Sequence, residues 1–197
     1  SYAGDNSSGM YFWGCQVETN PSASSYVATT SAAAYGPRKH VVYDGDTYPE
    51  MNLVLQSQTL DNVVWSKSDT TVSANALTAP DGTLTADKVV ESATTAGHSV
   101  LQGVALSAAT PVVVSVYAKQ AERKRLAIYE ASFSGANVTF DTSTGTVVAT
   151  GGGGSPAGTI EDVGSGWYRC SMKFTPTGTG NHNILLYLQE DSGSGPG

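Results

Sequence analysis

The chain has 197 residues, which is enough for one domain of ordinary size or for one domain with an appendage. Its apolar fraction of 40% and charged fraction of 14% exclude disorder throughout. Its formal net charge of −7 argues against non-specific nucleic-acid binding, which depends on lysine and arginine neutralising phosphates. The one basic cluster, at residues 119–125, is predicted to be a solvated turn between two strands.

No apolar run is long enough to span a membrane, so no membrane partner is expected. The sequence starts without a methionine and without a signal peptide, and we interpret it as a piece of a larger protein. The two cysteines, Cys15 and Cys170, each lie inside an apolar strand pattern without metal-type spacing. They are predicted to be buried free thiols rather than a disulfide.

The apolar residues come in short runs separated by turns rich in glycine, proline, serine and threonine, a pattern typical of an all-β sandwich or barrel. No convincing helix is predicted. Strands are expected near residues 10–18, 52–58, 70–76, 85–91, 98–106, 111–119, 124–132, 136–141, 146–150, 158–163, 166–175 and 182–190. Residues 141–145 are predicted to form a hairpin loop.

The first of these strands, 10–18, is apolar on both faces near its start and is therefore expected to be covered rather than at a sheet edge. Residues 19–51 are less regular, with a short strand expected at 41–43 before a turn at 44–46. We interpret 19–51 as a linker that crosses a surface of the domain. In the 166–175 strand, alternation puts Tyr168, Cys170, Met172 and Phe174 on the core face, and Trp167, Arg169, Ser171 and Lys173 on the other.

Several segments together resemble a known kind of module. These segments are residues 9–18, 52–57, 65–67, 79–83, 86–91, 115–119, 140–147 and 160–170. They resemble the jelly-roll module of phage and prophage tail and head fibres, which is similar to the carbohydrate-binding modules of xylanases and laminarinases. The segment 35–38 also looks like the connector that precedes this module in phage proteins. The resemblance implies a two-sheet antiparallel β-sandwich of jelly-roll type.

The order of the segments departs from the family. There, the strand that resembles 9–18 closes the module after a segment like 185–190, whereas here it comes first. The chain is then a piece cut from a tandem array, a permutant, or a molecule whose strand 10–18 completes a neighbour's sheet. We expect strand 10–18 to lie beside strand 184–190, within the chain or between chains, because a missing covered strand exposes unpaired backbone. The domain division is then 1–18 completing strand, 19–51 linker and 52–197 jelly-roll domain.

No catalytic constellation is apparent. His40, His98 and His182 are isolated and lack metal-ligand spacing, and no nucleophile elbow or phosphate loop occurs. The carboxylates Glu130, Asp141, Glu161, Asp162 and Glu190 could pair as the acid and base of a glycosidase, but the sequence does not place two of them at the required separation. Solvated strand ends are the expected role. The protein is therefore predicted not to be an enzyme.

A sugar site needs flat aromatic rings for C–H faces and nearby amides, carboxylates or arginines for hydroxyls. Strand alternation places Tyr117, Tyr129, Tyr187, Gln189 and Arg125 on faces opposite the apolar core positions. If their strands are adjacent in one concave sheet, these five residues line a ligand groove. The alternative is that the tyrosines pack at the sandwich rim, while Trp65 and Trp167 are expected to be core or turn anchors.

The resemblance also implies a structural Ca²⁺, which would need several converging oxygens. The predicted metal ligands are Asp44 and Asp46, with Asp81, Asp87 and Glu91 as further donors; the alternative for Asp44 and Asp46 is an ordinary turn.

The leading hypothesis is a non-catalytic carbohydrate-binding-like domain of a virion fibre that recognises a polysaccharide or host surface glycan. The expected location is the virion or the extracellular space. Two alternatives remain: a ligand-free spacer or assembly module of a virion, self-associating by strand exchange, and a binding module of a polysaccharide-degrading enzyme.

Overall fold

The computed structural model describes residues 1–41 and 47–191, and the side chains of 37–48 fall outside that description. The chain is all-β, with antiparallel strands, and no helix occurs in the described ranges. The strands are β1 (Tyr2–Ala3), β2 (Gly9–Glu18), β3 (Ala34–Val41), β4 (Thr47–Asn52), β5 (Ser66–Ser68), β6 (Thr70–Leu77), β7 (Ala86–Glu91), β8 (Thr95–Ala96), β9 (His98–Leu106), β10 (Val112–Gln120), β11 (Arg125–Glu130), β12 (Asn137–Asp141), β13 (Thr146–Gly151), β14 (Ala157–Gly164), β15 (Trp167–Phe174) and β16 (Gly180–Gln189).

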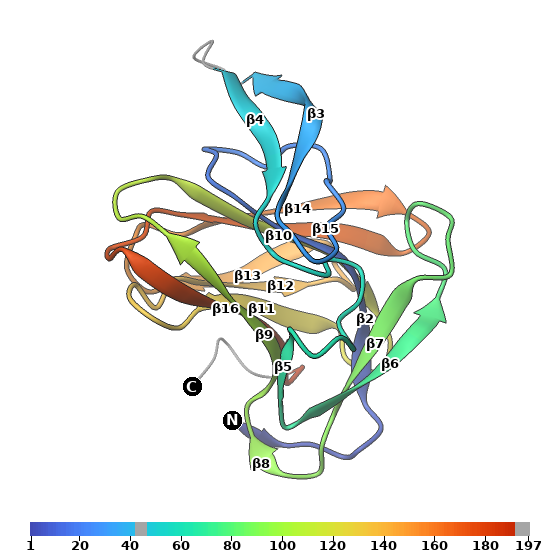
Figure 1. The fold of residues 1–197 in the computed structure, drawn as a ribbon. Coiled ribbons are helices and arrows are strands. Elements are labelled where there is room, and N and C mark those ends of the chain that lie inside the picture. The colour runs from blue at the N-terminus through green and yellow to red at the C-terminus, as the bar shows by residue number, and fades with distance from the viewer. Residues whose placement is uncertain (42–46, 192–197) are drawn as a thin grey trace.

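Two six-stranded sheets form the body of the molecule (Figure 1). The sheet that we call the β10 sheet has the order β14-β15-β10-β2-β7-β6, and the sheet that we call the β16 sheet has the order β13-β12-β11-β16-β9-β5. Short pairs β1-β8 and β3-β4 lie outside them. Most of the predicted strands are confirmed, including the β12–β13 hairpin, because alternation or β-branched runs mark them locally.

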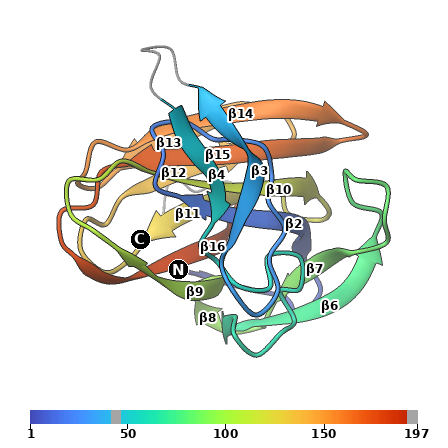
Figure 2. The same cartoon turned by 45° about the horizontal axis from the view of Figure 1, so that its top comes forward.

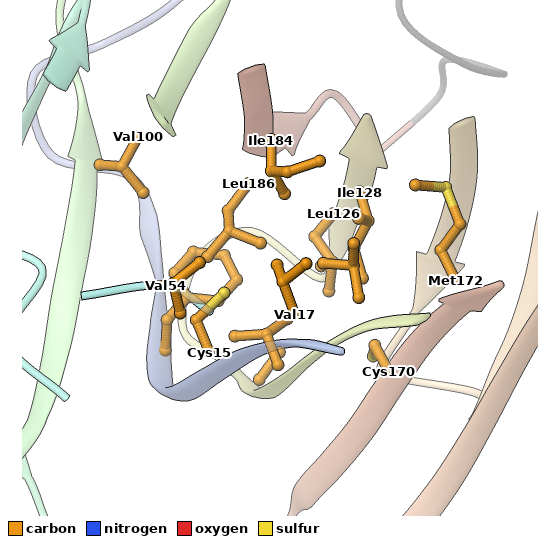
Figure 3. Packing of buried hydrophobic residues seen from close by; sticks show 14 of the residues in the cluster. Cys15, Val17, Val54, Val100, Leu126, Ile128, Cys170, Met172, Ile184 and Leu186 are labelled. Atoms are coloured by element: carbon orange, nitrogen blue, oxygen red, sulfur yellow. The ribbon is translucent and has the colours of Figure 1, made fainter. Parts of the chain in front are cut away.

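The apolar faces of the two sheets enclose one core (Figure 3). Val112, Val114 and Val116 of β10 point into it from one side, and Leu186 and Leu188 of β16 from the other. The predicted core face of β15 is confirmed, with Cys170, Met172 and Phe174 buried. Both cysteines are buried free thiols, as predicted.

Strand β2 is a covered strand, as its apolar pattern predicts, but its neighbours differ from the expectation. It lies between β10 and β7, whereas β16 lies in the opposite sheet between β11 and β9. The prediction that 10–18 lies beside 184–190 is therefore wrong. The backbone groups of β2 are taken up by β10 on one edge, and by β7 and residues 52–57 on the other, while β11 and β9 flank β16, so β2 and β16 cannot pair with each other.

The strand predicted at 52–58 is also absent; β4 ends at Asn52, and the chain then turns. The side chain of Asn52 is fully buried and holds this turn to β2 together with two backbone bonds, from Leu53 N–H to the Val17 carbonyl (2.9 Å) and from Cys15 N–H to the Ser57 carbonyl (3.0 Å). Its Oδ1 accepts from the backbone N–H of Val17 (3.1 Å) and Val54 (3.2 Å), and its Nδ2 donates to the carbonyls of Cys15 (2.9 Å) and Val27 (2.8 Å). One amide thus joins β2, the 19–33 segment and the turn after β4.

Residues 19–51 are not a simple linker, since they include the β3–β4 hairpin, whose tip projects from the body in Figure 1 and which passes in front of the sheets in Figure 2. The end of β4, with Glu50, Met51 and Asn52, is buried. Before the hairpin, the chain crosses the outer face of the β10 sheet, as expected for a surface crossing. It is held there by Gln16, which accepts from Val27 N–H (2.7 Å), and by Glu18, which accepts from Ser24 N–H (2.9 Å) and Oγ (2.5 Å).

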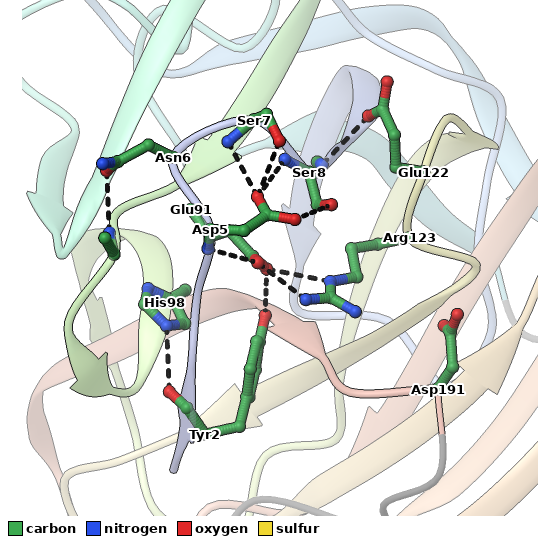
Figure 4. Close-up of polar contacts among 12 residues, drawn as sticks. Tyr2, Asp5, Asn6, Ser7, Ser8, Glu91, His98, Glu122, Arg123 and Asp191 are labelled. Atoms are coloured by element: carbon green, nitrogen blue, oxygen red, sulfur yellow. Dashed lines mark hydrogen bonds and ion pairs between the residues drawn. The ribbon is translucent and has the colours of Figure 1, made fainter.

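The N-terminal segment is fastened by a buried ion pair (Figure 4). Arg123 donates to both oxygens of Glu91, from Nε (2.9 Å) and from one terminal nitrogen (2.6 Å). The hydroxyl of Tyr2 donates to the same carboxylate at 2.6 Å, and the Arg123 guanidinium lies over the Tyr2 ring at 5.0 Å. Asp5 N–H adds a further bond of 3.1 Å to Glu91. This network places Gly9 at the start of β2, where its carbonyl accepts from Arg123 N–H.

Candidate functional site

An aromatic cluster lies on the outer face of the β10 sheet. Trp13 of β2 and Tyr117 of β10 are register partners, with ring centroids 5.3 Å apart. Tyr26, from the segment that crosses this face, packs 4.7 Å from Trp13 and 6.1 Å from Tyr117. A bulge in β2 makes room for the rings: Gly14 has φ of 62°, and a Cβ there would meet the rings of Tyr117 and Tyr26 at 3.1 and 3.2 Å. Unlike Trp13, both tyrosines are only partly buried.

Cations flank these rings. Arg169 of β15 is the register partner of Tyr117, and its guanidinium lies 5.6 Å from the Tyr117 ring centroid, a cation–π distance. It donates to Ser115 Oγ at 3.1 Å, while its Nε is buried without a partner. Lys119 of β10 is level with Trp167 and donates to the carbonyl of Ser165 at 2.6 Å. Lys173 continues the row along β15.

These three cations share one property. None of Lys119, Arg169 and Lys173 forms an ion pair within the described part of the chain. By contrast, Arg123 and Arg125 each hold a carboxylate. The outer face of β10 and β15 therefore carries unneutralised positive charge in a protein whose net charge is −7.

Two hollows open along the same face. The larger, of about 320 Å³, lies between residues 77–82 and the turn from β14 to β15, with Lys119, Pro80, Val163 and Trp167 in its lining. The smaller, of about 150 Å³, is lined by Pro21, Val113, Thr159, Ser171 and Lys173 among others. Arg169 and Tyr117 lie between them in the strand register. We call this region, from Trp167 and Lys119 to Lys173 and Val113, the β10–β15 face.

The two tryptophans on this side anchor the structure. Trp13 and Trp167 are 4% and 2% exposed, and their indole nitrogens donate to Thr85 Oγ1 (3.1 Å) and to the Thr78 carbonyl (3.2 Å). Trp65 is likewise buried, with its indole N–H on the Gln56 carbonyl. The ring surface left for a ligand on the β10–β15 face therefore comes from tyrosine.

The five predicted ligand residues are not brought together. Tyr129 and Arg125 of β11 and Tyr187 and Gln189 of β16 share the outer face of the β16 sheet. Tyr117 lies on the outer face of the opposite sheet, so a single groove lined by all five is wrong. The expectation failed because alternation fixes which side of its strand a residue occupies, but not which sheet receives the strand.

The four residues on the β16 sheet are engaged locally. Arg125 Nε pairs with Asp141 at 3.0 Å, and Gln189 is 5% exposed. The pKa of Tyr187 is raised, first by burial and then by the nearby Tyr129 and Asp69. Its hydroxyl lies against Gly97, where any Cβ would overlap it. These contacts resemble the packing alternative more than an open sugar platform.

Sequence reasoning missed Trp13, Tyr26 and Arg169 as members of one cluster. A signal for Arg169 existed, because alternation in the 166–175 strand already put it on the outer face. No local signal exists for Tyr26, which reaches the cluster from an irregular segment.

The predicted calcium ligands Asp44 and Asp46 lie outside the described residues. The three further donors do not converge: Asp81 holds the turn at Thr83, Asp87 accepts from Leu60 and Asn75 N–H, and Glu91 pairs with Arg123. Within residues 1–41 and 47–191, no three histidine, cysteine, aspartate or glutamate side chains form a metal-binding group.

Comparison with known proteins leaves the family open. No family model matches the chain, and no curated protein matches it. In the described residues, no helix is long and apolar enough to cross a membrane.

Proposed function

We propose that this chain is a jelly-roll, carbohydrate-binding-like domain without catalytic activity, as found in virion fibres, and that it binds a glycan on the β10–β15 face. The observation that carries the proposal is the junction of Tyr117, Tyr26 and Arg169 between two hollows on one sheet face. Partly buried tyrosine rings would pack against the C–H face of a sugar ring, and the arginine held beside them would donate hydrogen bonds to the sugar hydroxyls.

The strand order supports a jelly roll with its closing strand first. We number the eight main strands 1 to 8 in the order β7, β9, β10, β11, β12, β15, β16 and β2, so that β2, although first in the sequence, is strand 8. The β10 sheet then contains the order 1, 8, 3, 6 and the β16 sheet the order 2, 7, 4, 5. This order agrees with that expected of an eight-stranded jelly roll and so supports the proposal. The hairpin strands β13 and β14 and the edge strands β5 and β6 extend it.

The positions of the chain ends agree with this order. Gly9, which begins β2, accepts from Arg123 N–H at 2.9 Å, and Asp191, just after β16, accepts from Lys124 N–H at 3.4 Å. The end of β16 (strand 7) and the start of β2 (strand 8) are thus hydrogen-bonded to two consecutive residues, Lys124 and Arg123. A jelly roll with β2 as its closing strand would therefore be complete in space, although β2 comes first in the sequence.

A binding rather than a hydrolytic role is supported by the carboxylates. Buried Glu130 accepts from the N–H groups of Ser132 (2.7 Å) and Ser134 (2.8 Å) and contacts His182 Nδ1 at 3.1 Å. Asp141 accepts from Ser143 and Arg125. Each serves its own turn, and the two that lie on strand β14, Glu161 and Asp162, are exposed.

Affinity electrophoresis against a panel of neutral and acidic soluble polysaccharides tests the proposal. We expect retardation by at least one polymer, and a several-fold weaker effect for Tyr117→Ala, since that change removes the ring between Trp13 and Arg169. The matched control is Tyr35→Ala, which removes a tyrosine that is 68% exposed on the β3–β4 hairpin. An unretarded wild-type protein with every polymer contradicts glycan binding.

A ligand-free spacer or assembly module is the second candidate, favoured by the place of β2 at the start of the chain, because exchange of that strand between copies would join modules into an array. Size exclusion with light scattering distinguishes an assembly module that exchanges β2 between copies from a spacer that keeps β2 within its own chain. Strand exchange requires an oligomer, whereas pairing within one chain permits a monomer.

A further inference from the structure

We infer that the ligand of the β10–β15 face is an acidic polysaccharide, one that carries carboxylates along an extended chain, such as a polyuronic acid. This inference rests on the proposed glycan binding and adds the chemical class of the sugar. It starts from the row of Lys119, Arg169 and Lys173, which no carboxylate neutralises within the described residues.

The cations follow one another along the strands. Lys119 is level with Trp167, Arg169 is two residues further along β15, and Lys173 is four residues beyond that. At a rise of about 3.3 Å per residue, the row is roughly 20 Å long. Outward-facing residues of one strand point the same way, so the three cations face a common side. A linear polymer that lies along β15 meets all three, whereas a single sugar meets one.

Each hollow contributes one cation and apolar walls. Lys119 enters the larger hollow, where Leu77, Pro80 and Val163 provide the apolar surface. Its ammonium donates one N–H to the Ser165 carbonyl, and its other two N–H groups can donate to a ligand. Lys173 stands at the smaller hollow beside Ser171 and Thr159. An apolar wall beside an ammonium suits a sugar ring with a carboxylate substituent.

Arg169, between the hollows, is the best oriented of the three. The Tyr117 ring lies beneath its guanidinium, and Ser115 holds one of its terminal nitrogens, so its planar fork is fixed. A fixed fork loses little entropy when it binds a carboxylate through two hydrogen bonds. A neutral sugar uses this group less fully, because hydrogen bonds between charged partners are stronger than those to hydroxyls.

The carboxylates near the row leave its charge in place. Glu161 of β14 is the register partner of Arg169 but is exposed and forms no ion pair with it. Glu18, on the outer side of β2, is fully buried beneath the crossing segment and is occupied by Gln16, Asn20 and Ser24. Neither blocks the approach of an anionic chain to Arg169.

The test compares polygalacturonate and alginate with their carboxyl-reduced, neutral forms, and with neutral glucans, by affinity electrophoresis and calorimetry on the whole chain. We expect at least about tenfold tighter binding to the acidic polymer than to its reduced form, and weaker binding as salt rises from 50 to 500 mM, because salt screens charge attraction. Arg169→Gln and Lys119→Gln are each expected to weaken binding about fivefold or more.

Lys124→Gln is the matched control, since it removes the same charge from the turn between β10 and β11, outside the β10–β15 face. Circular dichroism and the unfolding midpoint of each variant show whether the fold is kept. Equal binding of native and reduced polymers overturns the acidic ligand and leaves glycan binding intact. Equal losses in Lys124→Gln and Arg169→Gln also overturn it, because the attraction is then diffuse. Failure to bind any polymer ends both proposals.

Discussion

At the scale of single residues, the side-chain amide of Asn52 makes four hydrogen bonds to backbone groups. The Asn52 side chain is fully buried and satisfies two N–H groups and two carbonyls in three segments. Because buried polar groups are costly when unpaired, Asn52→Ala is expected to lower the free energy of unfolding by about 3 kcal/mol. Urea denaturation measures the loss.

Asn137→Ala is the control for that change, since Asn137 is half-buried and makes one bond, to the Gly135 carbonyl. A loss at Asn52 no larger than that at Asn137 contradicts the role given to the Asn52 amide.

Gly14 offers a second test at this scale. Its positive φ disfavours any side chain by about 1 kcal/mol, and a methyl group there presses on Tyr117 and Tyr26. Gly14→Ala is expected to destabilise by roughly 2 kcal/mol. Gly135 has the same φ of 62° with no atom near its missing Cβ, so Gly135→Ala isolates the backbone cost. If the two alanine variants unfold at the same urea concentration, the contact with the rings has no energetic weight.

At the scale of elements, the turn after β11 is tied to one carboxylate. Burial acts to raise the pKa of Glu130, but bonds from Ser134, Ser132 and Phe133 outweigh it, so the pKa is lowered overall from its usual 4.5. A carboxyl whose pKa falls on folding stabilises the protein above its unfolded pKa. That contribution is lost as the pH falls through the lower, folded value.

We therefore expect Glu130→Gln to cost stability at pH 7 and to flatten the decline in stability below pH 4.5. Urea midpoints measured from pH 7 to pH 3 show both effects. Glu161→Gln, at an exposed position of β14, is expected to leave the curve unchanged. An unchanged acid limb in Glu130→Gln contradicts the account.

The same scale explains what the sequence could reveal. Strands such as β9, expected at 98–106 and found at His98–Leu106, are encoded by local alternation. The apolar run after Asn52 reads as a strand, yet the chain turns there and is held to β2 by the buried Asn52 amide and by two backbone bonds, of Leu53 with Val17 and of Cys15 with Ser57. Local pattern cannot register such a long-range replacement.

The candidate site was predictable only in part, for a related reason. Tyr117 was identified as outward-facing, which is correct, but its neighbours Trp13 and Arg169 come from strands far away in sequence. The pairing of β10 with β2 and β15, rather than with β11 and β16, follows from how the whole chain crosses between sheets.

At the scale of the whole molecule, the jelly-roll proposal implies that the same fold could form with the chain ends at another place in the sequence. If β2 is the closing strand, the protein should tolerate a circular permutation. A chain that begins at Ala32, runs through Asp191, continues by a flexible linker into Ser1 and ends at Ser31 is expected to fold.

Residues 31–33 are exposed, so the new ends disturb no core contact. The permutant should keep the circular dichroism spectrum and an unfolding temperature within about 5 °C of the parent, with linker length as the variable. A permutant that stays unfolded at every linker length contradicts the assignment of β2 as the closing strand.

The two thiols lie on either side of β10, Cys170 level with Val116 and Cys15 on β2 at the bulge. Strands two positions apart in a sheet are roughly 10 Å from each other, beyond the reach of an S–S bond. A cross-link between them can form only in a molecule whose central strand has left its place. A mild oxidant added during heating or storage would therefore form a Cys15–Cys170 disulfide only in molecules in which β10 has been displaced. A non-reducing gel would then show what fraction of the molecules had opened in this way, even after the others had refolded.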